Sequence, residues 1–299
     1  MPAGQPPRVV SVLAYPWACD AWSDPREEAV VEELPVSIVI NGAPYAVMLV
    51  TPLDLEDFVR GFLWTETVLQ KPEDILALEM VATAEGLAIY VQVPAAAADR
   101  ASALRRVLPG GSACGLCGVP DFAAMQPFSS LTPRHADVDV LEISTIFSEM
   151  ERQQIQNRQN GNTHAAALRL ANGTVLVRED IGRHNAVDKV LGAALLSGQE
   201  PGYATLLAVS SRLSFEILRK ALAWRIPVVA AISGVSSLAI DVARRNHVLL
   251  VGYARESRCT VYGVLPARGK REGEQSSTAA ERSSMELAAS PLRYWPARP

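Results

Sequence analysis

Short apolar runs broken by an Asn-Gly pair occur twice in the chain. Asn-Gly is the pair that best tolerates the left-handed backbone of a two-residue type I′ turn, and apolar runs on both sides of it indicate a hairpin. The first pair is Asn41-Gly42 and the second is Asn172-Gly173. We therefore predict two hairpins of the same turn type, formed by residues 35–40 with 43–50 and by residues 165–170 with 175–178.

A helical pattern follows the first hairpin. Apolar side chains recur at i, i+3, i+4, i+7 and i+8, which places on one buried face Leu55, Phe58, Val59, Phe62 and Leu63. Thr51 is expected to cap this helix, with Pro52 at its first position. Glu56, Asp57 and Arg60 are expected to face water. A strand at 87–93 and a helix at 98–107 complete a small α/β unit.

Apolar strands and amphipathic helices alternate in the second half of the chain. A polar helix at 146–159 is expected to be solvated or to face a partner. After the second hairpin, helices are predicted at 185–196, 214–224 and 236–245, with strands at 206–209, 228–232 and 248–251. This alternation predicts a parallel sheet that is covered on both faces.

Ligands of such sheets bind beyond the carboxyl ends of the strands. Those ends are Ser210-Ser211, Ser233-Gly234 and residues 253–258, which include two arginines. The helices that begin near Ser214 and Ser236 would point free N–H groups the same way. An anionic ligand such as a nucleotide phosphate is therefore expected at this edge.

Composition narrows the class of protein. With 299 residues, 49% of them hydrophobic, and a net charge of −4, the chain can bury a sizeable core and has no bulk positive charge for nucleic acid. Neither a signal sequence nor an apolar run of the roughly 18 residues that a spanning helix needs is found. A cytoplasmic protein with no membrane or nucleic-acid partner is expected. We expect a loose lead-in over residues 1–28, an N-terminal α/β subdomain over 29–109 and a cysteine loop with connector over 110–140. An α/β core is expected over 141–265 and a disordered tail over 266–299.

Two cysteines stand in the glycine-rich run Gly-Gly-Ser-Ala-Cys-Gly-Leu-Cys-Gly, residues 110–118. Such a run does not favour regular structure, so Cys114 and Cys117 are expected on a mobile, accessible loop. A structural zinc site needs four ligands, and the other cysteines and the histidines do not have the spacing to supply the remaining two. A deaminase would need a His-x-Glu motif, which the sequence does not contain. Gly115 and Gly118 make a poor start for the helix of a thioredoxin-type pair. A thiol that accepts sulfur covalently and passes it on fits what remains.

A second dense cluster of ionisable residues spans 178–185, Arg-Glu-Asp-Ile-Gly-Arg-His-Asn. Spacing alone favours a charged turn capped by Asp180, although five ionisable groups around one glycine exceed what capping requires. Thr163-His164 lies just ahead of the hairpin that leads there. His164 and His184 are therefore candidate ligand contacts, whereas Asp188 and Lys189 are interpreted as an exposed helical pair.

These motifs together resemble one family. The residues that carry the likeness are Cys114-Gly-Leu-Cys-Gly118, Asn162-Thr-His-Ala-Ala-Ala167, Arg178 to Lys189, Ser210-Ser-Arg-Leu-Ser-Phe-Glu216 and Tyr253-Ala-Arg-Glu-Ser-Arg258. They look like the FdhD family of sulfurtransferases, which are accessory proteins for formate dehydrogenase. The resemblance implies an α/β fold whose three-layer core is similar to cytidine deaminases, beside a smaller N-terminal subdomain, and it implies a homodimer.

The resemblance also implies an activity. The protein would take persulfide sulfur from a cysteine desulfurase and transfer it to the bis-molybdopterin guanine dinucleotide molybdenum cofactor, before the cofactor enters the formate dehydrogenase catalytic subunit. Cys114 would carry the persulfide with Cys117 as its helper, and a guanine nucleotide would act as a cofactor analogue. The closing segment implied to contact the cofactor is Tyr253, Ala254, Arg255, Glu256, Ser257 and Arg258. Further candidate cofactor contacts come from the polar clusters, and they are Thr163, His164, Asp180, Arg183, His184 and Ser211.

Two alternatives stay open. The chain could be a non-catalytic chaperone that binds the cofactor or the apo-enzyme and uses its thiols as soft ligands. Alanine at Cys114 distinguishes the two, because it would abolish dehydrogenase activity and spare cofactor binding only in a sulfur carrier. A zinc-binding regulator is the weaker alternative, which metal analysis of the pure protein would exclude.

Overall fold

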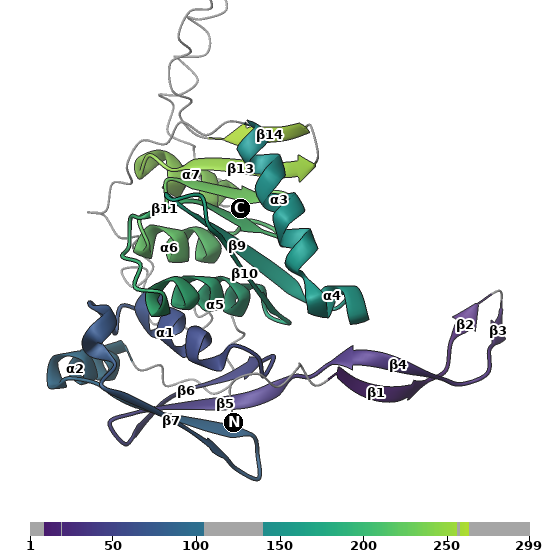
Figure 1. Cartoon of the computed structure of the whole chain (residues 1–299), viewed down its shortest axis with the longest axis horizontal. Helices are drawn as coiled ribbons and strands as arrows, with labels where there is room; N and C mark the ends of the chain where they lie inside the picture. The colour runs from purple at the N-terminus through teal and green to yellow at the C-terminus, as the bar shows by residue number, and fades with distance from the viewer. Residues whose placement is uncertain (1–8, 19, 105–139, 256–257, 263–299) are drawn as a thin grey trace, which may run out of the picture. The chain divides into compact units, whose positions relative to one another are not determined.

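The computed structural model describes residues 9–18, 20–104, 140–255 and 258–262 (Figure 1). The predictions for Cys114 and Cys117, for Glu256 and Ser257, and for the tail lie outside the described residues. Within the described ranges, no helix is long and apolar enough to cross a membrane.

The first described residues form a two-stranded ribbon. β1 (Val9–Ala14) pairs antiparallel with β4 (Arg26–Val31), and β2 (Trp17–Ala18) pairs with β3 (Ala21–Trp22) between them. The prediction of a loose lead-in over residues 1–28 is therefore wrong from Val9 onward. β1 is rich in valine, whose branched side chain favours extended backbone, and no proline interrupts the paired residues.

A four-stranded sheet follows, in the order β6-β5-β8-β7. Its strands are β5 (Leu34–Ile40), β6 (Ala43–Val50), β7 (Ala77–Ala82) and β8 (Leu87–Gln92). The first predicted hairpin is confirmed as β5 and β6, and both turn residues are left-handed, with φ of 48° at Asn41 and 83° at Gly42. β8 confirms the strand expected at 87–93, whereas β7 was not predicted. A short 3-10 helix covers Pro72–Asp74.

Two helices cover one face of this sheet: α1 (Leu55–Thr65) and α2 (Ala95–Leu104). The apolar face predicted for α1 is buried at Phe58, Val59, Phe62 and Leu63, and Leu55 is partly buried at its start. The helix begins at Leu55 rather than directly after Thr51, because Asp54 has a left-handed backbone (φ 50°) and the Thr51 hydroxyl accepts the N–H of Ile181 instead of capping. Asp57 is also not in water, since it is buried and its carboxylate lies 2.7 Å from Arg178 Nε. α2 begins three residues before the predicted start.

Six strands form the second sheet, in the order β10-β9-β11-β12-β13-β14. They are β9 (His164–Leu170), β10 (Val175–Asp180), β11 (Ala204–Val209), β12 (Val228–Ala231), β13 (Leu249–Arg255) and β14 (Arg258–Tyr262). β11, β12 and β13 run parallel, and every other pairing is antiparallel. The three strands predicted from the alternation with helices are thus confirmed as parallel, and the predicted hairpin of β9 and β10 is antiparallel, as a tight turn requires. The antiparallel strand β14 at the other edge was not predicted.

The second predicted hairpin is confirmed as β9 and β10, but its turn type is wrong. Gly173 is left-handed (φ 86°) and its N–H donates to the Leu170 carbonyl. Asn172 Oδ1 accepts the N–H of Thr174. This is the pattern of a longer loop with a bulge rather than of a two-residue type I′ turn.

Helices lie on both faces of the second sheet (Figure 1). α5 (Arg183–Leu196), α6 (Phe215–Ala223) and α7 (Ser237–Arg245) pack on one face, and α3 (Val140–Gln153) packs on the other. The polar helix predicted at 146–159 is in fact part of α3 followed by α4 (Ile155–Asn160). α3 is more than a solvated surface, because Ile143, Ile146 and Met150 are buried against the sheet.

The two sheets are joined where α1 lies along α5 (Figure 1). A Cβ on Gly61 would stand 1.8 Å from the Asp188 carbonyl oxygen, and one on Gly192 would stand 1.8 Å from that of Asp57. The helix backbones therefore touch without intervening side chains. Glycine is required at both crossing positions for this distance of approach.

Candidate functional site

One edge of the second sheet collects the polar turns of the chain. The carboxyl ends of β10, β11, β12 and β13 lie there beside the amino ends of β9 and β14, which run the other way. α5, α6 and α7 each begin just after one of these strands, so all three start at the same edge. This is the edge at which ligands of open α/β sheets bind, as the sequence predicts.

A hollow of about 420 Å³ opens at this edge beside β13 and β14. It is lined by Ile232, Tyr253, Arg255, Arg258, Cys259 and Thr260. The structure thus brings three of the predicted cofactor contacts around one space. Arg255 Nη1 donates to the Ile232 carbonyl at 2.9 Å, which holds that guanidinium at the rim. Ala254 instead points into the core, where it is 3% exposed.

Tyr253 has an unusual backbone. Its φ is 52°, at a register shift between Gly252 and Arg255, and its N–H donates to the Ser233 carbonyl at 3.0 Å. A Cβ on Gly234 would stand 2.8 Å from the Tyr253 hydroxyl, so the glycine leaves room for the ring over this turn. Holding a non-glycine residue in this region costs on the order of 1–3 kcal/mol, and such residues cluster at functional sites.

His164 stands at the start of β9 on the same edge. Its Nδ1 lies 3.4 Å from Ser210 Oγ, which also accepts the N–H of Ala165 at 2.9 Å. Burial lowers the pKa of His164, and the Arg183 guanidinium lowers it further while Asp180 opposes both. The imidazole is therefore neutral at pH 7 and offers hydrogen bonds rather than charge.

Thr163 is used inside the protein. Its hydroxyl donates to Glu179 Oε1 at 2.9 Å, and the same carboxylate accepts the N–H groups of Gln156 and Asn157, each at 2.8 Å. Glu179 is thereby the carboxylate that satisfies the first N–H groups of α4. Thr163 positions that carboxylate, and it is itself 9% exposed.

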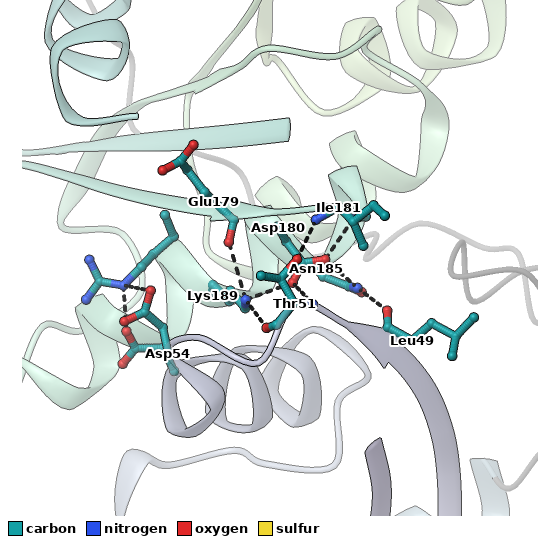
Figure 2. A network of polar contacts seen from close by, with 11 residues as sticks. Leu49, Thr51, Asp54, Glu179, Asp180, Ile181, Asn185 and Lys189 are labelled. Atoms are coloured by element: carbon teal, nitrogen blue, oxygen red, sulfur yellow. Dashed lines mark hydrogen bonds and ion pairs between the residues drawn. The ribbon is translucent and has the colours of Figure 1, made fainter. Parts of the chain in front are cut away.

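Asp180 lies at the centre of a polar network between the two sheets (Figure 2). Its side chain has no exposed surface and accepts the N–H groups of Thr51 at 3.0 Å and Gly182 at 2.7 Å, and the Asn185 amide at 2.9 Å. Lys189 Nζ lies 2.7 Å away and also donates to the Thr51 carbonyl at 2.9 Å. In this structure the Asp180 carboxylate therefore joins the two sheets rather than facing a ligand.

The remaining predicted contacts divide between surface and interior. Arg183 is partly exposed in the first turn of α5, near His164. His184 is 2% exposed, and Ser211 is 5% exposed with its hydroxyl donating to the Arg212 carbonyl at 3.0 Å. The sequence-predicted residues that the structure leaves accessible on one edge are thus Tyr253, Arg255, Arg258, His164 and Arg183.

The interpretation of Asp188 and Lys189 as an exposed pair is wrong. Both are buried and each pairs with a different residue: Lys189 with Asp180, and Asp188 with Lys220 Nζ at 2.7 Å. Thr65 of α1 donates to Asp188 Oδ1 at 2.7 Å. The signal was present in the sequence, because α5 is apolar around most of its circumference, and charges on such a helix must be buried and paired.

Comparison with known proteins agrees with this arrangement. The model of the FdhD/NarQ family matches residues 31–268. The sulfur carrier protein FdhD of Bordetella petrii is 37% identical over 238 residues, which cover 79% of this chain and 85% of that protein. Its counterpart in Xanthomonas axonopodis pv. citri is 38% identical over 240 residues, covering 79% and 84%.

A solved structure is also similar. It is the crystal structure of a formate dehydrogenase accessory protein from Desulfotalea psychrophila, with a TM-score of 0.65 and 25% sequence identity. The alignment covers 87% of this chain and 98% of the Desulfotalea chain. The matched family model spans both sheets and the edge that gathers the accessible polar residues. The chain belongs to the FdhD/NarQ family.

Proposed function

We propose that this chain is a sulfurtransferase of the carrier type. It takes persulfide sulfur from a cysteine desulfurase and delivers it to the bis-molybdopterin guanine dinucleotide cofactor that the formate dehydrogenase catalytic subunit receives. The observation that carries the proposal is the hollow at the sheet edge, where Tyr253, Arg255 and Arg258 surround one space. The names of the similar proteins, sulfur carrier protein and formate dehydrogenase accessory protein, support the same activity.

The chemistry of the hollow suits a guanine nucleotide, the end group of the proposed substrate. Arginine guanidinium groups bind phosphate oxygens in a bidentate manner, and a tyrosine ring offers a flat surface to a base. The volume of about 420 Å³ is within the usual range for small-molecule sites. The cofactor is a substrate here, held by its nucleotide end while its metal end receives sulfur.

The sulfur would be carried by Cys114. Its thiolate attacks the outer sulfur of the desulfurase persulfide, a new S–S bond forms at Cys114, and the old S–S bond breaks with the desulfurase thiolate as the leaving group. For delivery, the Cys117 thiolate would attack the inner sulfur of the Cys114 persulfide, which forms a Cys114–Cys117 disulfide and releases the outer sulfur as sulfide to the cofactor. A cellular dithiol reductant would then restore the two thiols. An accessible thiolate is the group that this exchange requires.

We also propose a cytidine-deaminase-like layout for the core, and action in the cytoplasm as a homodimer. Support for the layout comes from an antiparallel hairpin placed beside three parallel strands, with helices on both faces. Sedimentation of the purified protein tests the dimer.

The decisive experiment is peptide mass spectrometry after incubation with a cysteine desulfurase and cysteine. A reductant-sensitive gain of one sulfur on the Cys114 peptide is expected, and it should be lost in Cys114→Ala. Cys259→Ala is the matched control, because Cys259 lines the hollow and lies outside the Cys-x-x-Cys pair. Absence of sulfur on either thiol, with an active desulfurase, would contradict the carrier and favour a non-catalytic cofactor-binding chaperone.

Nucleotide binding tests the other half of the proposal. Arg258→Ala should weaken GDP binding, because it removes a guanidinium from the lining of the hollow. Arg244→Ala, in the last turn of α7, is the matched control and should bind GDP as the wild type does. If Arg258→Ala binds GDP as tightly as Arg244→Ala does, the hollow is not the nucleotide site.

A further inference from the structure

β6 is an edge strand of the N-terminal sheet, and the end of its free side faces the first turn of α5. Leu49 stands opposite Pro35 of β5. Proline has no N–H, and the Leu49 carbonyl accepts a hydrogen bond from Asn185 Nδ2 at 2.8 Å, so this pair is not hydrogen-bonded within the ladder (Figure 2). The N–H and C=O of Leu49 therefore point away from β5, toward the first turn of α5.

The same orientation recurs at every second residue. Two residues further on, the N–H of Thr51 donates to Asp180 and the Thr51 carbonyl accepts from Lys189 Nζ. The backbone groups at this end of the edge are therefore already hydrogen-bonded inside the protein. Two residues back, Val47 stands opposite Ser37 and directs its N–H and C=O to the same side. Among the described residues, none is placed to bond the backbone of Val47 on that side.

The side chains of this edge are also unusual. Val47 is 67% exposed and Leu49 is 49% exposed. The eight residues of β6 include no charged side chain, whereas the edge strands β7, β10 and β14 all carry charges. Proteins commonly protect an edge strand with charges, because an apolar edge with free backbone groups pairs with other extended chains. Pro44 and a register shift protect the first half of β6, whereas no charge protects Val47 to Leu49, the half that faces α5.

We propose that an extended, uncharged segment of the formate dehydrogenase catalytic subunit binds along β6 as an added strand. The proposal rests on the proposed function for the identity of the partner. Main-chain hydrogen bonds to the N–H and C=O of Val47 and to the N–H of Leu49 supply affinity, because the Leu49 carbonyl already accepts from Asn185. The exposed side chains of Val47 and Leu49 select an apolar segment. A segment laid there ends at Asn185, in the first turn of α5. Arg183 is in the same turn, and His164 stands opposite Asp180 in the register of β9 and β10. Docking therefore places the partner at the β10 end of the sheet edge whose β13–β14 end would hold the cofactor.

Variants of β6 test the proposal. Val47→Pro removes the outward N–H without removing a ladder bond to β5, a position at which edge strands tolerate proline. Leu49→Lys introduces the missing charge. Each should weaken binding of the purified apo-subunit about tenfold, the equivalent of one to two net hydrogen bonds. Val81→Lys, on the opposite edge strand β7, is the matched control and should bind as the wild type does, and all three should retain GDP affinity.

Hydrogen–deuterium exchange on the wild type gives a second readout that needs no variant. Addition of the apo-subunit should slow exchange at the amides of Val47 and Leu49. Unchanged exchange there, or wild-type affinity in both β6 variants, would overturn the proposal. Protection that appears without the subunit and grows with protein concentration would also overturn it, in favour of a second copy of this chain. A wild type that binds the subunit but accepts no sulfur would contradict the proposed function alone.

Discussion

Replacing Lys220 by methionine would leave a buried carboxylate without its cation. Lys220 Nζ donates to the two Asp188 oxygens at 2.8 and 2.7 Å and to the Thr65 hydroxyl at 3.0 Å, and Asp188 is 1% exposed. Methionine retains much of the aliphatic stem, so the change removes charge and donors more than packing. Breaking a buried pair in this way costs about 3–5 kcal/mol of unfolding free energy.

The pH decides how much of this loss is observed. Burial raises the pKa of Asp188, against the lowering effect of Lys220 and Thr65. Without Lys220 that pKa rises further, so the folded protein holds the proton to a higher pH than the unfolded chain does. The resulting loss of stability is present above the folded-state pKa and fades as the pH falls through it toward the ordinary value of 3.8. Lys220→Met should therefore lose less stability at pH 5 than at pH 8.

Urea unfolding followed by circular dichroism at both pH values measures the effect. At pH 8 the melting temperature should also fall by on the order of 10 °C. The double variant Asp188→Asn with Lys220→Met carries no buried charge at these positions and should recover most of the loss. An equal loss at the two pH values, with no recovery in the double variant, would show that packing rather than an unpaired charge explains the result.

Two further predictions concern the junction and the site. Gly192→Ala should melt far below the wild type, because its Cβ would stand 1.8 Å from the Asp57 carbonyl oxygen. The control Gly198→Ala, in open space at φ 73°, should cost only about 1–2 kcal/mol of backbone strain, and equal losses would contradict the close helix contact. In NMR titrations His164 should have a pKa below 6.5, and Arg183→Ala should raise it by removing a nearby positive charge. An unchanged midpoint would show that Arg183 does not act on the imidazole.

Elements governed by neighbouring residues were predictable. The Asn41-Gly42 turn and the buried face of α1 follow from backbone preference and from side-chain spacing, which act over a few residues. The alternation of apolar strands and helices indicated the centre of the second sheet for the same reason. β7 and β14 were not predicted, because each gains its pairing from a strand next to it in space and carries a weak pattern of its own.

Local signals failed where a distant partner competed for the same group. Thr51 has the residue type and the following proline of a helix cap, yet its hydroxyl and backbone bond Ile181, Asp180 and Lys189 across the junction. The choice between a local and a distant hydrogen bond depends on which donor the fold brings close.

For the candidate site, the sequence alone determined which side chains are available and that arginines and hydroxyls follow the strand ends. Tertiary structure alone decided that Tyr253, Arg255 and Arg258 surround one hollow, while Asp180 is buried and paired with Lys189. The physical reason is that the free energy of an ionisable group depends on its solvent exposure and on the charge nearest to it in space. Both are properties of the packed chain, and the order of the residues does not specify either of them locally.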